Sequence, residues 1–447
     1  MNYSEALEKL QSFGQQHLLH YWESLSESEQ QQLLKQIVAL DIPTFNLQKN
    51  LLKQQLKPLK NIKPIQDTVS EGTTDDYELG LQILADARVG CILIAGGQGT
   101  RLNLKGPKGL VEITPIRKKT LFQLFAEKVV AASKRAKAHL PLAIMTSPLN
   151  HEETVDFFKK NKNFGLLDEQ LDFFTQEMLP FVSKEGNLFL ESPSKIAQGP
   201  DGNGMSLRYF VNHKIWEKWK RKGVDYCTYI LVDNPLADPF DPVLIGNHHR
   251  SQTDVTVKCI ERIKADEKVG LIVKQDDKVI VVEYTEMPEA EKSAVDKKGK
   301  LLHRCANMSN FCLSMDFVWE AAKIPLPLHC NLKAAKNIDK EEKEENKAWK
   351  FETFIFDILP YAMHVRALLV KREMAFAPLK NASGDDSFES VQKALQHQAI
   401  AQFEKITGTT ISGDHFFELG QEFYYPTPEL KQKWKGKSLP ASDYVEG

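Results

Sequence analysis

The 447-residue sequence lacks several features that would indicate a membrane, metal-binding or nucleic-acid-binding protein. No apolar run approaches the ~20 residues of a membrane-spanning helix. The N-terminus has neither the basic nor the apolar region of a signal peptide. Its six cysteines form no C-x-x-C pair, which argues against a zinc site and favours free thiols in a reducing compartment. Lys and Arg number 58 against 60 Asp and Glu, so no basic excess indicates nucleic acid. We expect a cytoplasmic protein with no membrane or nucleic-acid partner.

Two familiar glycine motifs for nucleotide binding are also absent. The string G-x-x-x-x-G-K-[ST] of a P-loop does not occur. Gly97 and Gly99 begin the dinucleotide fingerprint G-x-G-x-x-G, but Leu102 stands where its third glycine belongs. Both absences disfavour a P-loop nucleotidase and a dinucleotide-dependent oxidoreductase.

The most informative stretch that is present runs from Cys91 to Leu110. The apolar residues 91–94 predict a buried strand, which stops at Ala95-Gly96-Gly97, where small residues let successive N–H groups converge on an anion. Two cations follow, Arg101 and Lys108, the second directly after a proline. The glycine pair alone is equally typical of an ordinary strand-to-helix turn. Together with the two cations it predicts a site for a polyanion such as a nucleoside triphosphate.

Short apolar stretches alternate with longer stretches of helical periodicity, a pattern typical of a mostly parallel α/β sheet. Ligands of such sheets gather at the carboxyl ends of the strands. The predicted strands are 91–94, 141–147, 171–176 and 226–232, and the predicted helices are 75–87, 120–137, 151–160 and 205–222.

Polar residues follow several of these strands. Asp233 comes directly after strand 226–232, where a carboxylate facing a phosphate loop is a suitable ligand for Mg²⁺, although it is also suited to capping a turn. The turn at 200–204 exposes backbone together with the amide of Asn203, which suits the imide edge of uracil. The same residues also make a good ordinary turn.

The remaining chain suggests three parts. Residues 1–72 form an N-terminal helical segment, in which a capping box at Ser26 and Glu29 begins a helix. Within it, 51–72 have no clear period and are predicted to form a connection that wraps onto the central domain. Residues 73–385 form the central domain, within which 254–315 read as antiparallel strands. Residues 386–447 form a short C-terminal lobe with a helix at 392–405.

The strings GGQGTRL, PKG and KTLFQ, in that order from Gly96 to Gln123, resemble the eukaryotic UDP-N-acetylglucosamine pyrophosphorylase family. The resemblance extends over approximately Gly14 to Gly408. It includes PDGNG, where Met205 replaces a further glycine, and VDN, VEYTE and FAPLKN. In the segment 305–311 the chain departs from the family pattern, because Ala306 and Phe311 replace a glycine and a histidine.

The resemblance implies a Rossmann-like nucleotidyltransferase sheet (GT-A-like) with an antiparallel sugar-binding part. It implies that UTP and N-acetylglucosamine 1-phosphate react, with Mg²⁺, to give UDP-N-acetylglucosamine and pyrophosphate. A UTP–glucose-1-phosphate uridylyltransferase, a broader UDP-sugar pyrophosphorylase and a non-catalytic nucleotide-sugar sensor are the alternatives. We expect a monomer or a homodimer.

The resemblance also implies roles for individual residues. Arg101 and Lys108 act in catalysis at the triphosphate, and Asp233 holds Mg²⁺. The other residues contact the substrates. The nucleotide-binding residues are Ile94, Ala95, Gly96, Gly97, Lys108, Gln176, Gly202, Asn203 and Asp233, and those for the sugar or its phosphate are Gly270, Glu283, Tyr284, Asn307, Lys350 and Lys380.

Overall fold

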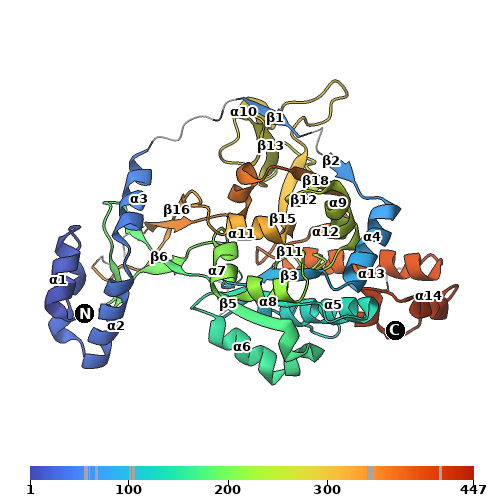
Figure 1. Ribbon diagram of the computed structural model, residues 1–447, viewed down its shortest axis with the longest axis horizontal. Helices are drawn as coiled ribbons and strands as arrows, with labels where there is room; N and C mark the ends of the chain where they lie inside the picture. The colour runs from blue at the N-terminus through green and yellow to red at the C-terminus, as the bar shows by residue number, and fades with distance from the viewer. Residues whose placement is uncertain are drawn as a thin grey trace. The chain divides into compact units, whose positions relative to one another are not determined.

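The structure is a computed structural model that describes residues 1–54, 59, 61–65, 69–99, 102, 106–339, 347–411 and 415–447 (Figure 1). Its contacts divide the chain into two compact units. The smaller unit combines Met1–Lys57, Gln176–Met205 and Pro325–Phe354, and the larger combines Pro58–Thr175, Ser206–Ile324 and Ile355–Gly447. The three-part division by sequence position stays a prediction.

The larger unit is built on one sheet, which has 11 strands among the described residues. Its main path is β2-β18-β12-β15-β11-β3-β4-β5, and β13, which pairs with β15, brings in β1 and β14. The strands are β1 Ile62–Pro64, β2 Val69–Glu71, β3 Val89–Ile94, β4 Leu142–Thr146, β5 Leu171–Thr175, β11 Tyr226–Leu231, β12 Val255–Glu261, β13 Leu271–Gln275, β14 Lys278–Val282, β15 Cys305–Ser314 and β18 Val365–Val370.

The part of this sheet that carries the glycine loop is parallel, as predicted. Strands β11, β3, β4 and β5 are parallel neighbours, and every residue of β3 is buried. Strand β15 then runs antiparallel between β11 and β12, and β13 and β14 form an antiparallel pair beside it. The predicted α/β fold class, with an antiparallel part, is therefore confirmed.

Helices of the larger unit pack closely enough to require small residues. Helix α4 lies against α9, where a Cβ on Gly80 would stand 1.9 Å from the carbonyl oxygen of Pro242. A Cβ on Gly246 would stand 1.9 Å from the carbonyl oxygen of Asp76. The helices are α4 Thr74–Ala85, α5 Leu121–Ala136, α6 His151–Lys160, α7 Ser206–Asn212, α8 Ile215–Arg221, α9 Pro242–Ser251, α10 Glu289–Lys292, α11 Met315–Ala321, α12 Arg372–Ala375, α13 Phe388–Thr407 and α14 Pro428–Trp434.

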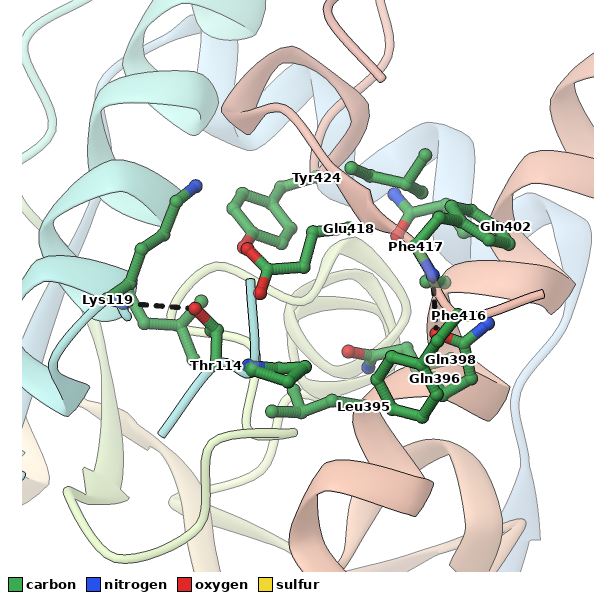
Figure 2. Close-up of a pocket in the computed structure, with 14 residues that line it drawn as sticks. Thr114, Lys119, Leu395, Gln396, Gln398, Gln402, Phe416, Phe417, Glu418 and Tyr424 are labelled. Atoms are coloured by element: carbon green, nitrogen blue, oxygen red, sulfur yellow. Dashed lines mark hydrogen bonds between the residues drawn. The ribbon is translucent and has the colours of Figure 1, made fainter. Parts of the chain in front are cut away.

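The C-terminal part of the chain packs onto the segment that follows the glycine loop. Helices α13 and α14 enclose a cluster around Phe403, and the short strands β19 Glu418–Leu419 and β20 Tyr444–Val445 pair beside them. The Glu418 carboxylate accepts from the backbone N–H of Ile116 at 2.6 Å. Figure 2 shows this carboxylate beside Thr114 and Lys119, at a cavity of about 50 Å³. Glu418, in the C-terminal part of the chain, thus holds the loop at Ile116, which follows Lys108.

The smaller unit combines three helices with short strands around its own apolar core. Its capping box at Ser26 and Glu29 is present as predicted. In this unit β6 pairs with β10, β8 pairs with β9, and β17 lies between β16 and β7. Its elements are α1 Tyr3–Gln11, α2 Glu27–Ala39, α3 Ile42–Lys53, β6 Met178–Pro180, β7 Val182–Ser183, β8 Leu190–Ser192, β9 Lys195–Ile196, β10 Gln198–Pro200, β16 His329–Ala334 and β17 Lys347–Glu352.

One local prediction is wrong. The single helix expected over 205–222 is two helices, α7 and α8, because Lys214 between them adopts a left-handed φ of 63°. The connection predicted over 51–72 does wrap onto the larger unit in its described part, since its short strands β1 and β2 pair with β13 and β18. Helix α3 extends into its start, as far as Lys53. Within the described residues, no helix has the length and hydropathy needed to cross a membrane.

Candidate active site

The glycine loop lies where three parallel strands of the larger unit end. Ala95 N–H donates to Met145 O of β4 at 2.7 Å, and Val232 N–H donates to Ile94 O at 3.0 Å. Gly97 is exposed, and a Cβ built on it would have no atom within 4 Å. Since packing within the described protein does not require a glycine here, the open space suits a ligand that approaches the backbone.

Asn150 holds this loop and was missed by the sequence analysis. Its side chain is 1% exposed and donates to Ala95 O at 3.0 Å, while its Oδ1 accepts from Ser147 N–H at 2.8 Å. It follows β4 in a Ser-Pro-Leu-Asn turn. Its place just beyond a predicted strand was the signal available in the sequence.

Lys108 and Asp233 meet beside the loop. Lys108 begins a 3-10 turn, Lys108–Leu110, and its N–H donates to Gly97 O at 3.2 Å. Its Nζ lies 3.5 Å from Oδ2 of Asp233, and the two side chains are 16% and 19% exposed. Arg101, the other cation assigned to catalysis, lies outside the described residues. The structure therefore brings together one of the two assigned cations, the glycine loop and the assigned metal ligand.

The segment 376–380 packs against Asp233. Leu379 N–H donates to Asp233 O at 2.7 Å, which places Lys380 one residue from this contact. Asn234, which the sequence analysis left without a role, donates to Ala375 O at 2.8 Å and accepts from Ala377 N–H at 3.1 Å. Hydrogen bonds thus join the segments 233–234 and 375–379, which are far apart in sequence, at the end of β11.

Lys380 and Asp386 lie close to Asp233 and influence one another's charge. Asp386 contributes its carbonyl oxygen to Lys380 N–H at 2.7 Å. Burial raises the pKa of the Asp386 carboxyl, Lys380 opposes that rise, and the nearby carboxylate of Asp233 adds to it. The site therefore holds two lysines and two carboxylates within mutual influence.

The residues around Asp233 fit a Mg²⁺ ion that is shared with a substrate. Mg²⁺ usually keeps waters and takes one or two carboxylates together with substrate phosphates. In the part of the chain that the structure describes, no group of three or more His, Cys, Asp or Glu side chains is gathered to hold a metal. Asp233, with Asp386 nearby, beside the glycine loop fits the shared arrangement rather than a site made by protein ligands alone.

Of the residues assigned to the sugar itself, Gly270, Glu283 and Asn307 lie together, next to the start of β13, the end of β14 and the start of β15. Asn307 N–H donates to Gly270 O at 2.8 Å. A Cβ on Gly270 would stand 3.2 Å from Oε1 of Glu283. Tyr284 follows Glu283 and is 37% exposed. The close approach at Gly270 explains a glycine there in physical terms.

The two departures from the family pattern both lie in the core. Ala306 is fully buried and pairs with Leu271. Phe311 is also fully buried, and its ring lies 5.8 Å from that of Tyr229 on β11. The Phe311 ring thus packs against the ring of Tyr229, its directly paired neighbour in the sheet.

The smaller unit groups the other four assigned residues. The turn with Gly202 and Asn203 is joined to the end of β17, since Thr353 N–H donates to Asp201 O at 2.8 Å. A Cβ on Gly202, where φ is +90°, would stand 2.3 Å from Thr353 O. Lys350, on β17, lies 2.8 Å from Glu352. Gln176 is 5% exposed and precedes β6, which pairs with β10 immediately before the turn. The structure thus gathers the assigned residues in three groups, two in the larger unit and one in the smaller unit.

Comparison with known proteins assigns the family. Residues 44–424 match the family described as UTP–glucose-1-phosphate uridylyltransferase. The chain belongs to this family. Among its relatives, UDP-N-acetylglucosamine diphosphorylase 2 of Arabidopsis thaliana is 33% identical over 408 residues, covering 85% of this chain and 80% of that protein. UDP-N-acetylglucosamine pyrophosphorylase of Saccharomyces cerevisiae is 31% identical over 97% of both chains.

A solved structure supports the same assignment to the uridylyltransferase family. The putative UDP-N-acetylglucosamine pyrophosphorylase of Entamoeba histolytica superposes with a TM-score of 0.77 and 27% identity. It covers 86% of this chain and 100% of the solved chain. The resemblance stated from the sequence is therefore confirmed.

Proposed function

We propose that this protein transfers the uridylyl group of UTP to N-acetylglucosamine 1-phosphate. The relatives named for UDP-N-acetylglucosamine synthesis align over most of this chain, and one aligns over 97% of it. The observation that carries the chemistry is the 3.5 Å approach of Lys108 to Asp233 beside the glycine loop. These two charges lie where a nucleotide phosphate and its cation would meet.

The reaction needs little proton transfer. An oxygen of the sugar phosphate forms a bond to the α-phosphorus of UTP, and the bond from that phosphorus to the β-phosphate oxygen breaks. Its electron pair leaves with pyrophosphate. Catalysis then consists of positioning two anions and stabilising the charge that develops on the leaving group.

In this scheme the residues of the larger unit have distinct tasks. The backbone at Gly96 and Gly97 receives the nucleotide phosphates, and the Lys108 ammonium stabilises the departing pyrophosphate. Asp233 would hold Mg²⁺, which supplies charge neutralisation of phosphate oxygens when bound. Lys380 neutralises the sugar phosphate. We propose Arg101 as the second catalytic cation, and this proposal rests only on its place in the motif GGQGTRL.

The sugar pocket is proposed to favour an acetamido group. Gly270 leaves room beside Glu283, and Asn307 has an amide that can donate to a carbonyl oxygen. A pocket built for those hydrogen bonds leaves polar groups unpaired when glucose binds, which costs about 1–3 kcal/mol for each group. In the smaller unit, Gln176, Gly202 and Asn203 are proposed to contact uridine, and Lys350 the sugar phosphate.

The compartment and the assembly are also proposals. All six cysteines are unpaired in the structure, which supports a reducing compartment such as the cytoplasm. A monomer or a homodimer is our expectation, which light scattering on the purified protein would decide.

The test is a comparison of kcat/KM for three sugar phosphates with UTP. We expect N-acetylglucosamine 1-phosphate to be preferred over glucose 1-phosphate, with N-acetylgalactosamine 1-phosphate weaker. If glucose 1-phosphate is the best substrate, the sugar assignment is wrong and uridylyl transfer stands. If UTP binds but releases no pyrophosphate in the presence of any of the three sugar phosphates, the nucleotide-sugar sensor is the better explanation.

A further inference from the structure

A second cavity lies in the larger unit, apart from the residues assigned to either substrate. Its volume is about 450 Å³, which is in the range of small-molecule pockets. Helices α4, α5, α13 and α14 contribute to its lining, together with the loop between β11 and α9. Of the described residues that we assign to UTP or the sugar, none lines it.

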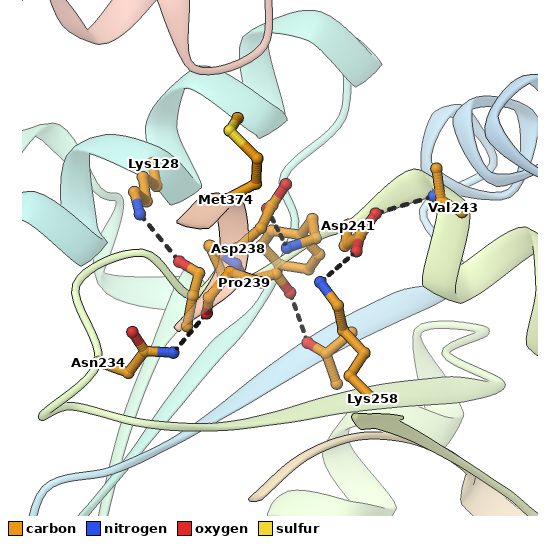
Figure 3. A network of polar contacts seen from close by, with 12 residues as sticks. Lys128, Asn234, Asp238, Pro239, Asp241, Val243, Lys258 and Met374 are labelled. Atoms are coloured by element: carbon orange, nitrogen blue, oxygen red, sulfur yellow. Dashed lines mark hydrogen bonds and ion pairs between the residues drawn. The ribbon is translucent and has the colours of Figure 1, made fainter. Parts of the chain in front are cut away.

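The floor of this cavity, which we call the lysine cavity, is charged but internally compensated (Figure 3). Lys128 is 4% exposed and donates to Pro235 O at 2.6 Å and to Ala237 O at 2.9 Å. Lys258 lies 2.6 Å from Asp241. Burial lowers the pKa of Lys128 to about 8 and raises the pKa of Asp238 to about 7. The two cations and two acids leave the floor near neutrality.

The mouth of the lysine cavity carries three further cations. Arg135 on α5, Lys405 on α13 and Lys431 on α14 line it, and the first is partly buried while the others are exposed. Among the described residues none of the three forms an ion pair within 4 Å, and Arg135 interacts at longer range with the Glu429 carboxylate. The Lys405 ammonium lies 5.7 Å from the centre of the Tyr77 ring. Cations from three helices converge on one opening beside aromatic surface.

We propose that the lysine cavity binds a phosphorylated small molecule that regulates turnover. Three cations that form no close ion pair with acids of the described chain suit the double charge of a phosphate monoester better than the single charge of a carboxylate. The tyrosine rings at positions 77, 424 and 425 offer apolar faces to the body of the ligand. The regulatory half of this proposal rests on the proposed function, whereas the binding half does not.

Contacts run from the cavity floor to Asp233. Lys128 holds the carbonyls of Pro235 and Ala237, two and four residues after Asp233. Met374 and Ala375 line the cavity, and Ala375 O accepts from Asn234. Figure 3 shows Lys128, Asn234 and Met374 around this loop. A ligand that moves Lys128 or Met374 therefore shifts the segment that carries the proposed metal ligand.

Binding is tested by calorimetry with phenyl phosphate, with benzoate and phenol as single-charge and neutral analogues. Saturating UDP-N-acetylglucosamine is present to fill the proposed active site. The test variant is Arg135→Gln/Lys431→Gln, and the matched control, Lys134→Gln/Lys433→Gln, removes the same charge from exposed positions on the same helices. We expect phenyl phosphate to bind about tenfold or more weakly to the test variant and normally to the control.

Three results would overturn the binding half. The first is an equal loss of affinity for phenyl phosphate in the test and control variants. The second is no binding of phenyl phosphate to the unaltered protein at millimolar concentration. The third is an affinity for benzoate or phenol equal to that for phenyl phosphate. The first would indicate general charge attraction, and the last would exclude phosphate as the recognised group.

Steady-state turnover tests the regulatory half. Phenyl phosphate should change kcat at least about twofold in the unaltered enzyme and the control, and leave the test variant at its unchanged basal rate. Inhibition that is competitive with the sugar phosphate in all three proteins would place phenyl phosphate in the active site and contradict the proposal. Binding at the cavity without any change in turnover would remove the regulatory role. Absence of turnover in every protein would instead refute the proposed function, and the calorimetry would still decide the cavity.

Discussion

Replacing Lys108 with alanine tests the role of the cation beside the glycine loop. Two unit charges 3.5 Å apart, as in the pair Lys108 and Asp233, interact by about 5 kcal/mol at an effective dielectric constant of about 20. Both groups keep some exposure, which reduces this value. This attraction is present in the resting enzyme, so the effect on the rate comes from the lost contact of Lys108 with the departing pyrophosphate. Losing one transition-state charge contact usually costs about 2.7–4 kcal/mol, equivalent to about 10²–10³-fold in kcat. We therefore expect Lys108→Ala to slow turnover by about 10²-fold or more.

The fold should survive this change, because the turn depends on its main chain. Lys108 contributes its N–H to Gly97 O, and a Cβ on Gly109 would stand 2.2 Å from the Phe122 ring. The assay is steady-state pyrophosphate release, with the thermal midpoint measured in parallel. Lys108→Arg keeps the charge and should recover part of the rate, while Lys134→Ala serves as an exposed-lysine control. Turnover of Lys108→Ala within about twofold of the unaltered enzyme would refute the reasoning.

Three further predictions concern the metal, the helix packing and pH. Asp233→Asn should raise the Mg²⁺ concentration at half-maximal rate, because an amide is a poorer ligand for a hard cation, and an unchanged titration with unchanged activity would place the metal elsewhere. Gly246→Ala should lower the free energy of unfolding by about 1–3 kcal/mol through overpacking against α4, and an unchanged denaturant midpoint would contradict this. Burial lowers the pKa of His248 from the ordinary value of 6.5 to about 3. Between these two pH values the unfolded chain binds a proton at His248 that the folded chain does not bind. Stability should therefore fall in that window by up to about 1.4 kcal/mol per pH unit as pH decreases, and His248→Gln should reduce the slope; equal slopes in the two proteins would show that other groups cause it.

Residues that carry a strong local pattern were predictable. The run 91–94 is apolar throughout, and β3 is buried throughout, because only a strand covered on both faces needs no polar residue. Asp233 and Lys108 were found from their places after a strand and a proline. Their approach to 3.5 Å follows from parallel strands ending at one edge of the sheet.

Features that depend on distant packing were not predictable. The break within 205–222 depends on the left-handed conformation of Lys214, which lysine rarely adopts. The hydrophobic periodicity therefore did not predict it. Asn150 donates to the backbone carbonyl of Ala95, 55 positions earlier in the chain, so its place after a strand could mark it as a candidate but could not identify the loop that it holds. Phe311 replaces a histidine in the family motif, but only the pairing of β15 with β11 puts its ring against Tyr229.

The central claim is that the sugar phosphate attacks the α-phosphorus of UTP. The direct measurement uses N-acetylglucosamine 1-phosphate labelled with ¹⁸O in its non-bridging phosphate oxygens, and follows the products by ³¹P NMR and mass spectrometry. Attack at the α-phosphorus predicts equal amounts of UDP-N-acetylglucosamine and pyrophosphate, with all label in the sugar nucleotide and none in pyrophosphate. Label in pyrophosphate, or UTP consumption without the sugar nucleotide, would contradict it.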